Sequence, residues 1–124
     1  MTKEILVHRI VPNIYSDNLE ACKPFYIDFL GMEPVMDLGW IITFASPQNP
    51  ATQISVLKND KRILTDNAAV FISIEVSDLE ALHKKANEQK IEITYPLTTE
   101  AWGVRRFFVK DPNGATLNLL SHNA

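Results

Sequence analysis

A repeat within the chain constrains its fold more than any other feature. The sequence SDNLEA at residues 16–21 returns, one residue shorter, as SDLEA at residues 77–81. Trp40 and Pro47 have counterparts in Trp102 and Pro112, at separations of 62 and 65 residues. Matches that recur in the same order at similar spacing indicate a duplicated structural unit. The sequence therefore predicts two modules of the same architecture.

The elements expected in the first half follow from its residue pattern. Apolar and β-branched residues predict a strand over residues 4–15, and Pro12 marks an edge or a bulge because it lacks a backbone donor. Residues 16–18 supply helix N-cap chemistry, and apolar residues at helical spacing follow as far as Gly31. Pro24 lies beyond the first turn, so we expect a kink or a distorted first turn. Short strands are expected at residues 33–36, 40–45 and 52–57.

The second half is expected to follow the same order and to end in a hairpin. Its pattern predicts a strand over residues 69–76, a helix from the cap at residues 77–78 to Gln89, a short strand over residues 91–95 and a loop over residues 97–101. In the closing segment, Asp111, Pro112 and Gly114 occupy the first, second and fourth positions of a type I turn. Runs of β-branched and aromatic residues flank this turn on both sides.

These elements give the order β-α-β-β-β, linker, β-α-β-β-β. The stretch near residues 58–68 is polar and lacks periodicity, so it is the expected linker. The predicted fold is α+β, with tandem βαβββ modules at residues 1–60 and 66–124. At 124 residues the chain has the length of a single domain.

Composition excludes several classes of function. The net charge of −3 and the pI near 5.5 argue against nonspecific nucleic-acid binding, which needs a basic surface. Cys22 is the only cysteine, so neither an intrachain disulfide nor a cysteine metal cage is expected, and it is expected to pack in the core. The sequence has no signal-peptide run and no apolar segment of membrane-spanning length. A cytoplasmic protein that binds no membrane is therefore expected.

The two modules, the helix end from Phe25 and Tyr26 to Gly31, and the Asp-Pro-Asn-Gly hairpin at Asp111 together resemble the vicinal oxygen chelate superfamily. That superfamily includes glyoxalase I, extradiol dioxygenases, fosfomycin-modifying enzymes and bleomycin-binding resistance proteins. The resemblance covers essentially the whole chain. It implies that the strands of both modules form a half-open mixed β cup, with the helices outside and, in many members, a divalent metal inside.

The resemblance also implies where metal ligands would stand. Counting seven residues back from the Asp that opens each helix gives Ile10 and Phe71, and counting seven forward from the turn positions Ser46 and Asp111 gives Gln53 and Asn118. Ile10 and Phe71 have no lone pair to donate, and neutral amides are poor ligands for the metals that this superfamily uses. We therefore expect no metal and no cofactor. Metal-free members bind a small molecule in the same cup.

The residues predicted to face the cup follow from strand alternation. On the first strand of the second module, Phe71, Ser73 and Glu75 are expected to face inward, and Ile72, Ile74 and Val76 to face the helix. The superfamily pattern adds Trp102, Val104, Arg106 and Phe108 from the strand before last. The predicted ligand-binding residues are Trp40, Gln53, Phe71, Glu75, Trp102, Arg106, Phe108 and Asn118.

Each predicted role has a structural alternative. Arg106 could hold an anionic or carbonyl group, or it could form a structural ion pair with a carboxylate such as Glu75, and the two roles can coexist. The two tryptophans could wall a pocket or fill the core. The amides Gln53 and Asn118 could orient a ligand or hydrogen-bond to each other.

The leading hypothesis is a metal-free, homodimeric protein that binds a bulky or aromatic small molecule and sequesters a drug or metabolite. The alternative is a glyoxalase-like lyase or isomerase with Glu75 as its base, or a dioxygenase-type enzyme with a non-standard site. A displaced metal site could then use His8, Glu75 and His122. A regulatory binding module is a third possibility.

Overall fold

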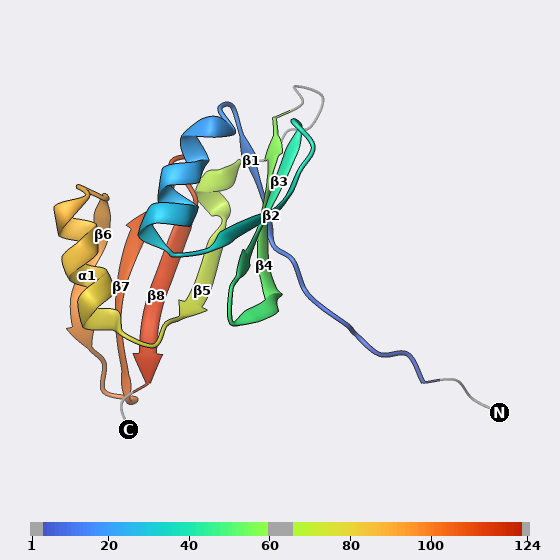
Figure 1. The fold of residues 1–124 in the computed structure, drawn as a ribbon. Coiled ribbons are helices and arrows are strands. Elements are labelled where there is room, and N and C mark those ends of the chain that lie inside the picture. The colour runs from blue at the N-terminus through green and yellow to red at the C-terminus, as the bar shows by residue number, and fades with distance from the viewer. Residues whose placement is uncertain (1–3, 60–65, 123–124) are drawn as a thin grey trace.

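The computed structural model describes residues 4–59 and 66–122, which form two four-stranded mixed sheets with helices (Figure 1). The strand orders are β1-β4-β3-β2 and β5-β8-β7-β6. In each sheet the first strand pairs in parallel with the last, and the remaining pairs are antiparallel. The identical orders confirm the predicted α+β fold of tandem βαβββ-like modules. The strands are β1 (Asn13–Ser16), β2 (Glu33–Asp37), β3 (Ile41–Ser46), β4 (Asn49–Lys58), β5 (Phe71–Glu75), β6 (Ile93–Thr99), β7 (Val104–Lys110) and β8 (Thr116–His122).

The second module has the regular helix that its sequence predicts. Helix α1 (Leu79–Glu88) begins at Asp78, whose side chain accepts a hydrogen bond from the Ala81 N–H at 3.0 Å. The helix buries Leu79 and Ala86 and packs on β7 and β8. Within the residues that the structure describes, no helix is long and apolar enough to cross a membrane.

The first module has a more distorted helix than its sequence predicts. A 3-10 turn, η1 (Glu20–Cys22), leads into a π-helix, η2 (Pro24–Phe29). The wider turn is seen in the Leu30 N–H, which donates to the Phe25 carbonyl at 3.0 Å. Pro24 has no N–H to continue a regular ladder, so the expected distortion of one turn extends through the whole helix.

One hydrophobic core joins both modules. It contains Tyr26 and Phe29 from η2, Phe44 from the first sheet and Phe107 from the second, all at most 1% exposed. The Tyr26 ring stacks on Phe44 at 5.1 Å, and its hydroxyl donates to the buried Asp111 carboxylate at 2.8 Å. Burial, reinforced by this carboxylate, raises the pKa of Tyr26 well above its usual value. The helix of one module is therefore tied to the turn of the other.

The closing hairpin agrees with its prediction. Strands β7 and β8 are joined by a turn in which the Gly114 N–H donates to the Asp111 carbonyl at 3.1 Å. The Asp111 side chain also accepts from the N–H groups of Asn113 and Ala115, both at 2.9 Å. Gly114 has a φ of 90°, a conformation that a side chain would disfavour.

The structure departs from two of the predicted strand and loop boundaries, and it describes only the ends of the predicted linker. The strand predicted over residues 4–15 forms only as β1, and residues 4–12 are neither helix nor strand. The loop predicted over residues 97–101 is wrong in part, because β6 extends to Thr99. Most of the predicted linker at residues 58–68 coincides with residues 60–65, which lie outside the described residues. Its last part contains a 3-10 turn, η3 (Asn67–Ala69).

Candidate ligand-binding face

A row of side chains crosses the face of the second sheet that points away from α1. Ser73 on β5, Asn118 on β8, Phe108 on β7 and Tyr95 on β6 are direct neighbours across the sheet. Directly paired residues share one face of a sheet. The alternate residues of β5, β7 and β8 pack into the core on the opposite face, among them Ile72, Ile74, Phe107, Val109, Leu117 and Leu119. The predicted division of β5 into two faces is therefore confirmed.

Aromatic rings dominate this open face. The Phe108 ring lies 5.1 Å from the Phe71 ring and 4.7 Å from the Tyr95 ring. Phe71 is 55% exposed and Trp102 is 66% exposed, which is unusual for side chains of this size. Because the aromatic surface is continuous and uncovered, it can bind a flat apolar molecule.

Arg106 is enclosed by these rings and neutralised by a carboxylate. Its guanidinium carbon lies 4.9 Å from the Phe108 ring centre and 5.3 Å from those of Tyr95 and Trp102. Its Nη2 and Nε lie 2.9 and 3.0 Å from the Glu100 carboxylate, which also accepts from the Tyr95 hydroxyl. The structural alternative, an ion pair of Arg106 with a carboxylate, is therefore present, with Glu100 rather than Glu75 as the partner. Arg106 orders the aromatic wall, and two of its nitrogens are already bonded.

Asn118 is the most unusual polar residue on this face. Its side chain is 6% exposed, and its Nδ2 donates to the Ser73 hydroxyl at 3.0 Å. Its Oδ1 is buried without a hydrogen-bond partner among the described residues. Leaving a buried acceptor unsatisfied costs about 1–3 kcal/mol. The Oδ1 therefore requires a donor, which water or a ligand can supply.

Glu75 and His122 form a contact near the end of the same sheet. The carboxylate of Glu75 lies against Nδ1 of His122, and both side chains are mostly exposed. His8 does not join them, because no group of three His, Cys, Asp or Glu side chains suited to a metal ion occurs in the described residues. The displaced metal site is therefore not assembled in this structure.

The predicted residues of the first module lie elsewhere. Gln53 accepts a hydrogen bond from Arg9 at 2.8 Å and donates to the Pro50 carbonyl at 2.9 Å, so it does not pair with Asn118. Trp40 is 55% exposed, which excludes the core-filling alternative. Ile10 is also exposed.

Six of the eight predicted residues therefore lie on the open face. These are Phe71, Glu75, Trp102, Arg106, Phe108 and Asn118. Tyr95 and Glu100 also lie at this site and were not predicted from the sequence. Tyr95 belongs to a predicted strand, so alternation along that strand could have placed it on the open face. Glu100 follows β6, whose two register shifts prevent simple alternation from predicting where its side chain lies.

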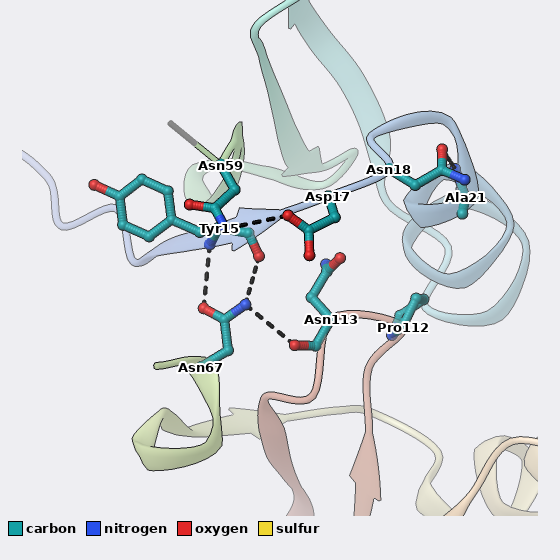
Figure 2. Close-up of a pocket in the computed structure, with 8 residues that line it drawn as sticks. All are labelled: Tyr15, Asp17, Asn18, Ala21, Asn59, Asn67, Pro112 and Asn113. Carbon is teal, nitrogen blue, oxygen red and sulfur yellow. Dashed lines mark hydrogen bonds between the residues drawn. The ribbon is translucent and has the colours of Figure 1, made fainter. Parts of the chain in front are cut away.

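A separate polar cavity lies between the modules, and none of the predicted residues line it (Figure 2). Its volume is about 210 Å³. Asn67 links the modules across it: its side chain accepts from the Tyr15 N–H at 3.2 Å and donates to the carbonyls of Tyr15 and Asn113. Because these bonds are internal, the cavity wall primarily joins the two modules. The lining residues are Tyr15, Asp17, Asn18, Ala21, Asn59, Asn67, Pro112 and Asn113.

Comparison with solved structures supports the fold. A glyoxalase/bleomycin resistance protein/dioxygenase superfamily member from Sphaerobacter thermophilus is 21% identical, with a TM-score of 0.78 over 94% of this chain and 98% of that one. A glyoxalase/bleomycin resistance protein/dioxygenase from Nocardioides is 15% identical, with a TM-score of 0.74 over 98% and 87%. A protein of unknown function from Agrobacterium tumefaciens is 21% identical, with a TM-score of 0.73 over 97% and 96%.

These structural similarities show the fold alone. No curated protein matches the chain. Residues 6–119, however, match a protein family over nearly the whole sequence. The chain therefore belongs to the glyoxalase/bleomycin resistance protein/dioxygenase superfamily.

Proposed function

We propose that this protein binds and sequesters a small aromatic molecule on the open face of the second sheet, without a metal ion. The observation that carries the proposal is the buried Asn118 Oδ1, which has no partner in the described part of the chain, on a residue directly beside Phe108 in the sheet. A ligand with a hydrogen-bond donor on an aromatic frame would satisfy this oxygen and cover Phe71 and Trp102. Such pockets typically combine apolar walls with a few placed polar groups.

The environment of Arg106 narrows the class of ligand. Because Glu100 balances its charge, the face offers little net attraction to an anion. Burial of the exposed rings contributes instead, at roughly 25 cal/mol per Å² of apolar surface removed from water. A neutral or weakly charged, flat ligand fits this surface better than a carboxylate or a phosphate.

The contact of Glu75 with His122 favours a second candidate function. A carboxylate that orients an imidazole is a common acid–base arrangement. In that case the protein would be a lyase or isomerase acting on the same ligand. Glu75→Gln would then abolish turnover while ligand binding persists, whereas a purely sequestering protein would show no turnover to lose.

The experiment for the first proposal is a thermal-shift screen of metal-stripped protein against aromatic metabolites and aromatic antibiotics. A hit is then titrated by isothermal calorimetry. Phe71→Ala and Asn118→Ala should each weaken binding by about tenfold or more, since each removes on the order of 1.4 kcal/mol of contact. Val35→Ala is the matched control, because Val35 is similarly exposed but lies on the first sheet.

Two results would overturn this proposal. One is that no aromatic compound raises the melting temperature of the metal-stripped protein. The other is that binding appears only after a divalent metal is added, which would favour metal-dependent chemistry.

A further inference from the structure

The polar cavity between the modules is lined by residues that take no part in the open aromatic face (Figure 2). Its volume of about 210 Å³ lies below the roughly 300–1,000 Å³ of sites for drug-sized ligands. Four of its eight lining residues are asparagines, and Asp17 is the one charged residue among them. The space and the polar lining therefore suit a small molecule that forms many hydrogen bonds.

The sequence repeat shows what is unusual about Asp17. In the second module, the equivalent Asp78 caps α1 by accepting a hydrogen bond from the Ala81 N–H at 3.0 Å. In the first module the repeat has one extra residue, Asn18, whose Oδ1 accepts from the Ala21 N–H at 3.3 Å. Because Asn18 takes over this bond, the Asp17 carboxylate is released from helix capping.

Asn59 holds the released carboxylate at the cavity. Its Nδ2 donates to the Asp17 Oδ1 at 3.1 Å, and this orientation leaves the Asn59 Oδ1 buried without a partner among the described residues. The opposite orientation of the amide would place an oxygen against the carboxylate, so Asp17 determines how the amide lies. Figure 2 shows the side chains of Asp17 and Asn113, from different modules, turned toward each other.

The hydrogen-bonding groups that remain in the lining are mixed. Within residues 4–59 and 66–122, the Asp17 Oδ2 accepts no hydrogen bond and the Asn18 Nδ2 donates none. The Asn67 side chain, by contrast, already bonds through both its oxygen and its nitrogen. A hydroxyl group both donates and accepts, so neighbouring hydroxyls match a free carboxylate oxygen beside free amide N–H groups.

Other classes of ligand fit the cavity less well. No lysine, arginine or histidine occurs among its described lining residues, so Asp17 repels an anion such as phosphate. A divalent cation needs several oxygen ligands, and the described residues contain no group of three His, Cys, Asp or Glu side chains that could hold one. An organic ammonium ion has no acceptor for the Asn18 N–H groups. A flat apolar molecule would leave the polar lining without partners.

We propose that the polar cavity binds a neutral polyhydroxylated molecule of monosaccharide size. Its adjacent hydroxyl groups donate to the Asp17 carboxylate, and one hydroxyl oxygen accepts from the Asn18 Nδ2. The Tyr15 ring and Pro112, which also line the cavity, supply apolar surface for the C–H groups of the ligand. The site does not involve the aromatic face, so it stands or falls independently of the proposed function.

An NMR titration tests this site. Isotope-labelled protein is titrated separately with glucose, galactose, mannose, ribose and myo-inositol, and the side-chain amide signals of Asn18 and Asn59 are followed. At least one of these compounds should shift both signals along a saturable curve. Methylammonium chloride and sodium acetate, which represent cations and anions, should produce no saturable shift.

Two variants localise the binding. Asp17→Ala should weaken it by about tenfold or more, because the variant lacks the charged acceptor. Asp28→Ala is the matched control, since Asp28 is also an exposed carboxylate of the first module but lies on η2, outside the cavity. This control should leave the binding curve unchanged.

Thermal unfolding separates a ligand-binding role of Asp17 from a structural one. Asp78→Ala should lower the melting temperature because it removes a helix cap. Asp17→Ala should lower it less, since Asn18 provides the equivalent bond in the first module. A loss from Asp17→Ala as large as that from Asp78→Ala would show that the carboxylate is a structural group and would contradict the proposal.

The titration can overturn the site in several ways. One is that no compound of the panel shifts the Asn18 and Asn59 amide signals along a saturable curve. Another is that such a curve is unchanged in Asp17→Ala. A stronger response to methylammonium chloride than to any sugar would assign the cavity to a cation instead. Shifts confined to Trp102 and Asn118 would place the sugar on the aromatic face and not in the cavity.

Discussion

The two modules share a strand order but differ in how completely each is built. In the second, β5 pairs with β8 along its length and α1 is a regular helix. In the first, β1 is short and its helix is a 3-10 turn followed by a π-helix. Local sequence explains the helices, because only the first contains a proline. The difference between the first strands has no such local cause, since residues 4–11 are as apolar as β5.

The modules also differ in what their open faces can do. Asn118 is buried beside Phe108 and Ser73, whereas Gln53, its counterpart, is bonded to Arg9 and the Pro50 carbonyl. Trp102 lies against Arg106, and among the described residues no comparable cation contact occurs on the ring of Trp40. Duplication has therefore produced two similar frameworks, of which the second carries the stronger candidate site.

The largest expected effect tests whether the modules are independent. Phe44→Ala in the first sheet and Phe107→Ala in the second should each lower the free energy of unfolding by about 3–5 kcal/mol. Because both side chains belong to one core, we expect a single cooperative transition in each variant. Urea unfolding followed by circular dichroism and by tryptophan fluorescence measures this. Two separate transitions would show that the modules unfold independently.

The next largest loss of stability is expected at the hairpin turn, where Asp111 of the second module bonds Tyr26 of the first. Asp111→Ala removes the acceptor of the Tyr26 hydroxyl and of two turn N–H groups, so it should cost about 3 kcal/mol. Tyr26→Phe removes one of these bonds and should cost about 1 kcal/mol. Ser46→Ala, at the corresponding turn of the first module, is the control and should change stability by less than about 0.5 kcal/mol. Chemical denaturation of the wild type and the three variants measures these losses of stability. Any other order of destabilisation would contradict the prediction.

A smaller effect is expected at the Arg106 site. Glu100→Gln removes the counterion of a guanidinium that is largely buried, with 22% of its side chain exposed. The expected loss of stability is about 1–2 kcal/mol, below the cost of breaking a fully buried pair because some solvent screening remains. Lys84→Gln is the control, since its 4.0 Å contact with Glu88 is exposed and should contribute little. Equal effects of the two substitutions would argue that the aromatic enclosure does not strengthen the pair.

The smallest effect involves Asp37, which lies on β2 and contacts Lys23 of the first helix at 3.4 Å. The Gly39 N–H, and then Lys23, lower the pKa of Asp37 below its usual value near 3.8. The contribution of a depressed carboxyl to stability is present above its unfolded pKa and is lost as the pH falls through the folded value. Asp37→Asn should therefore reduce the acid sensitivity of unfolding below about pH 4. The denaturation midpoints of the wild type and of Asp37→Asn are measured at pH 7 and at pH 3. If the midpoint falls equally in both proteins between these pH values, Asp37 does not contribute to the acid sensitivity.

The sequence correctly predicted the elements whose hydrogen bonds form between residues close together in the chain. The hairpin formed as expected because Asp111 and Gly114 satisfy a type I turn from within four residues. Helix α1 began at Asp78 for the same reason. The strand predicted over residues 4–15 did not form before Asn13, because a strand needs a partner that lies far away in the sequence. Glu100 was missed as the partner of Arg106 because register shifts in β6 decide where that residue lies.

The sequence by itself determined the duplication, the α+β class, the superfamily and the two faces of β5. These features depend only on the order and spacing of residues along the chain. Only the tertiary structure decided which polar atoms remain without partners, that Glu100 rather than Glu75 neutralises Arg106, and that residues 4–12 leave the first sheet at Pro12. These features depend on distances between residues far apart in the chain. Such distances arise only when the strands pair and the core closes around Tyr26.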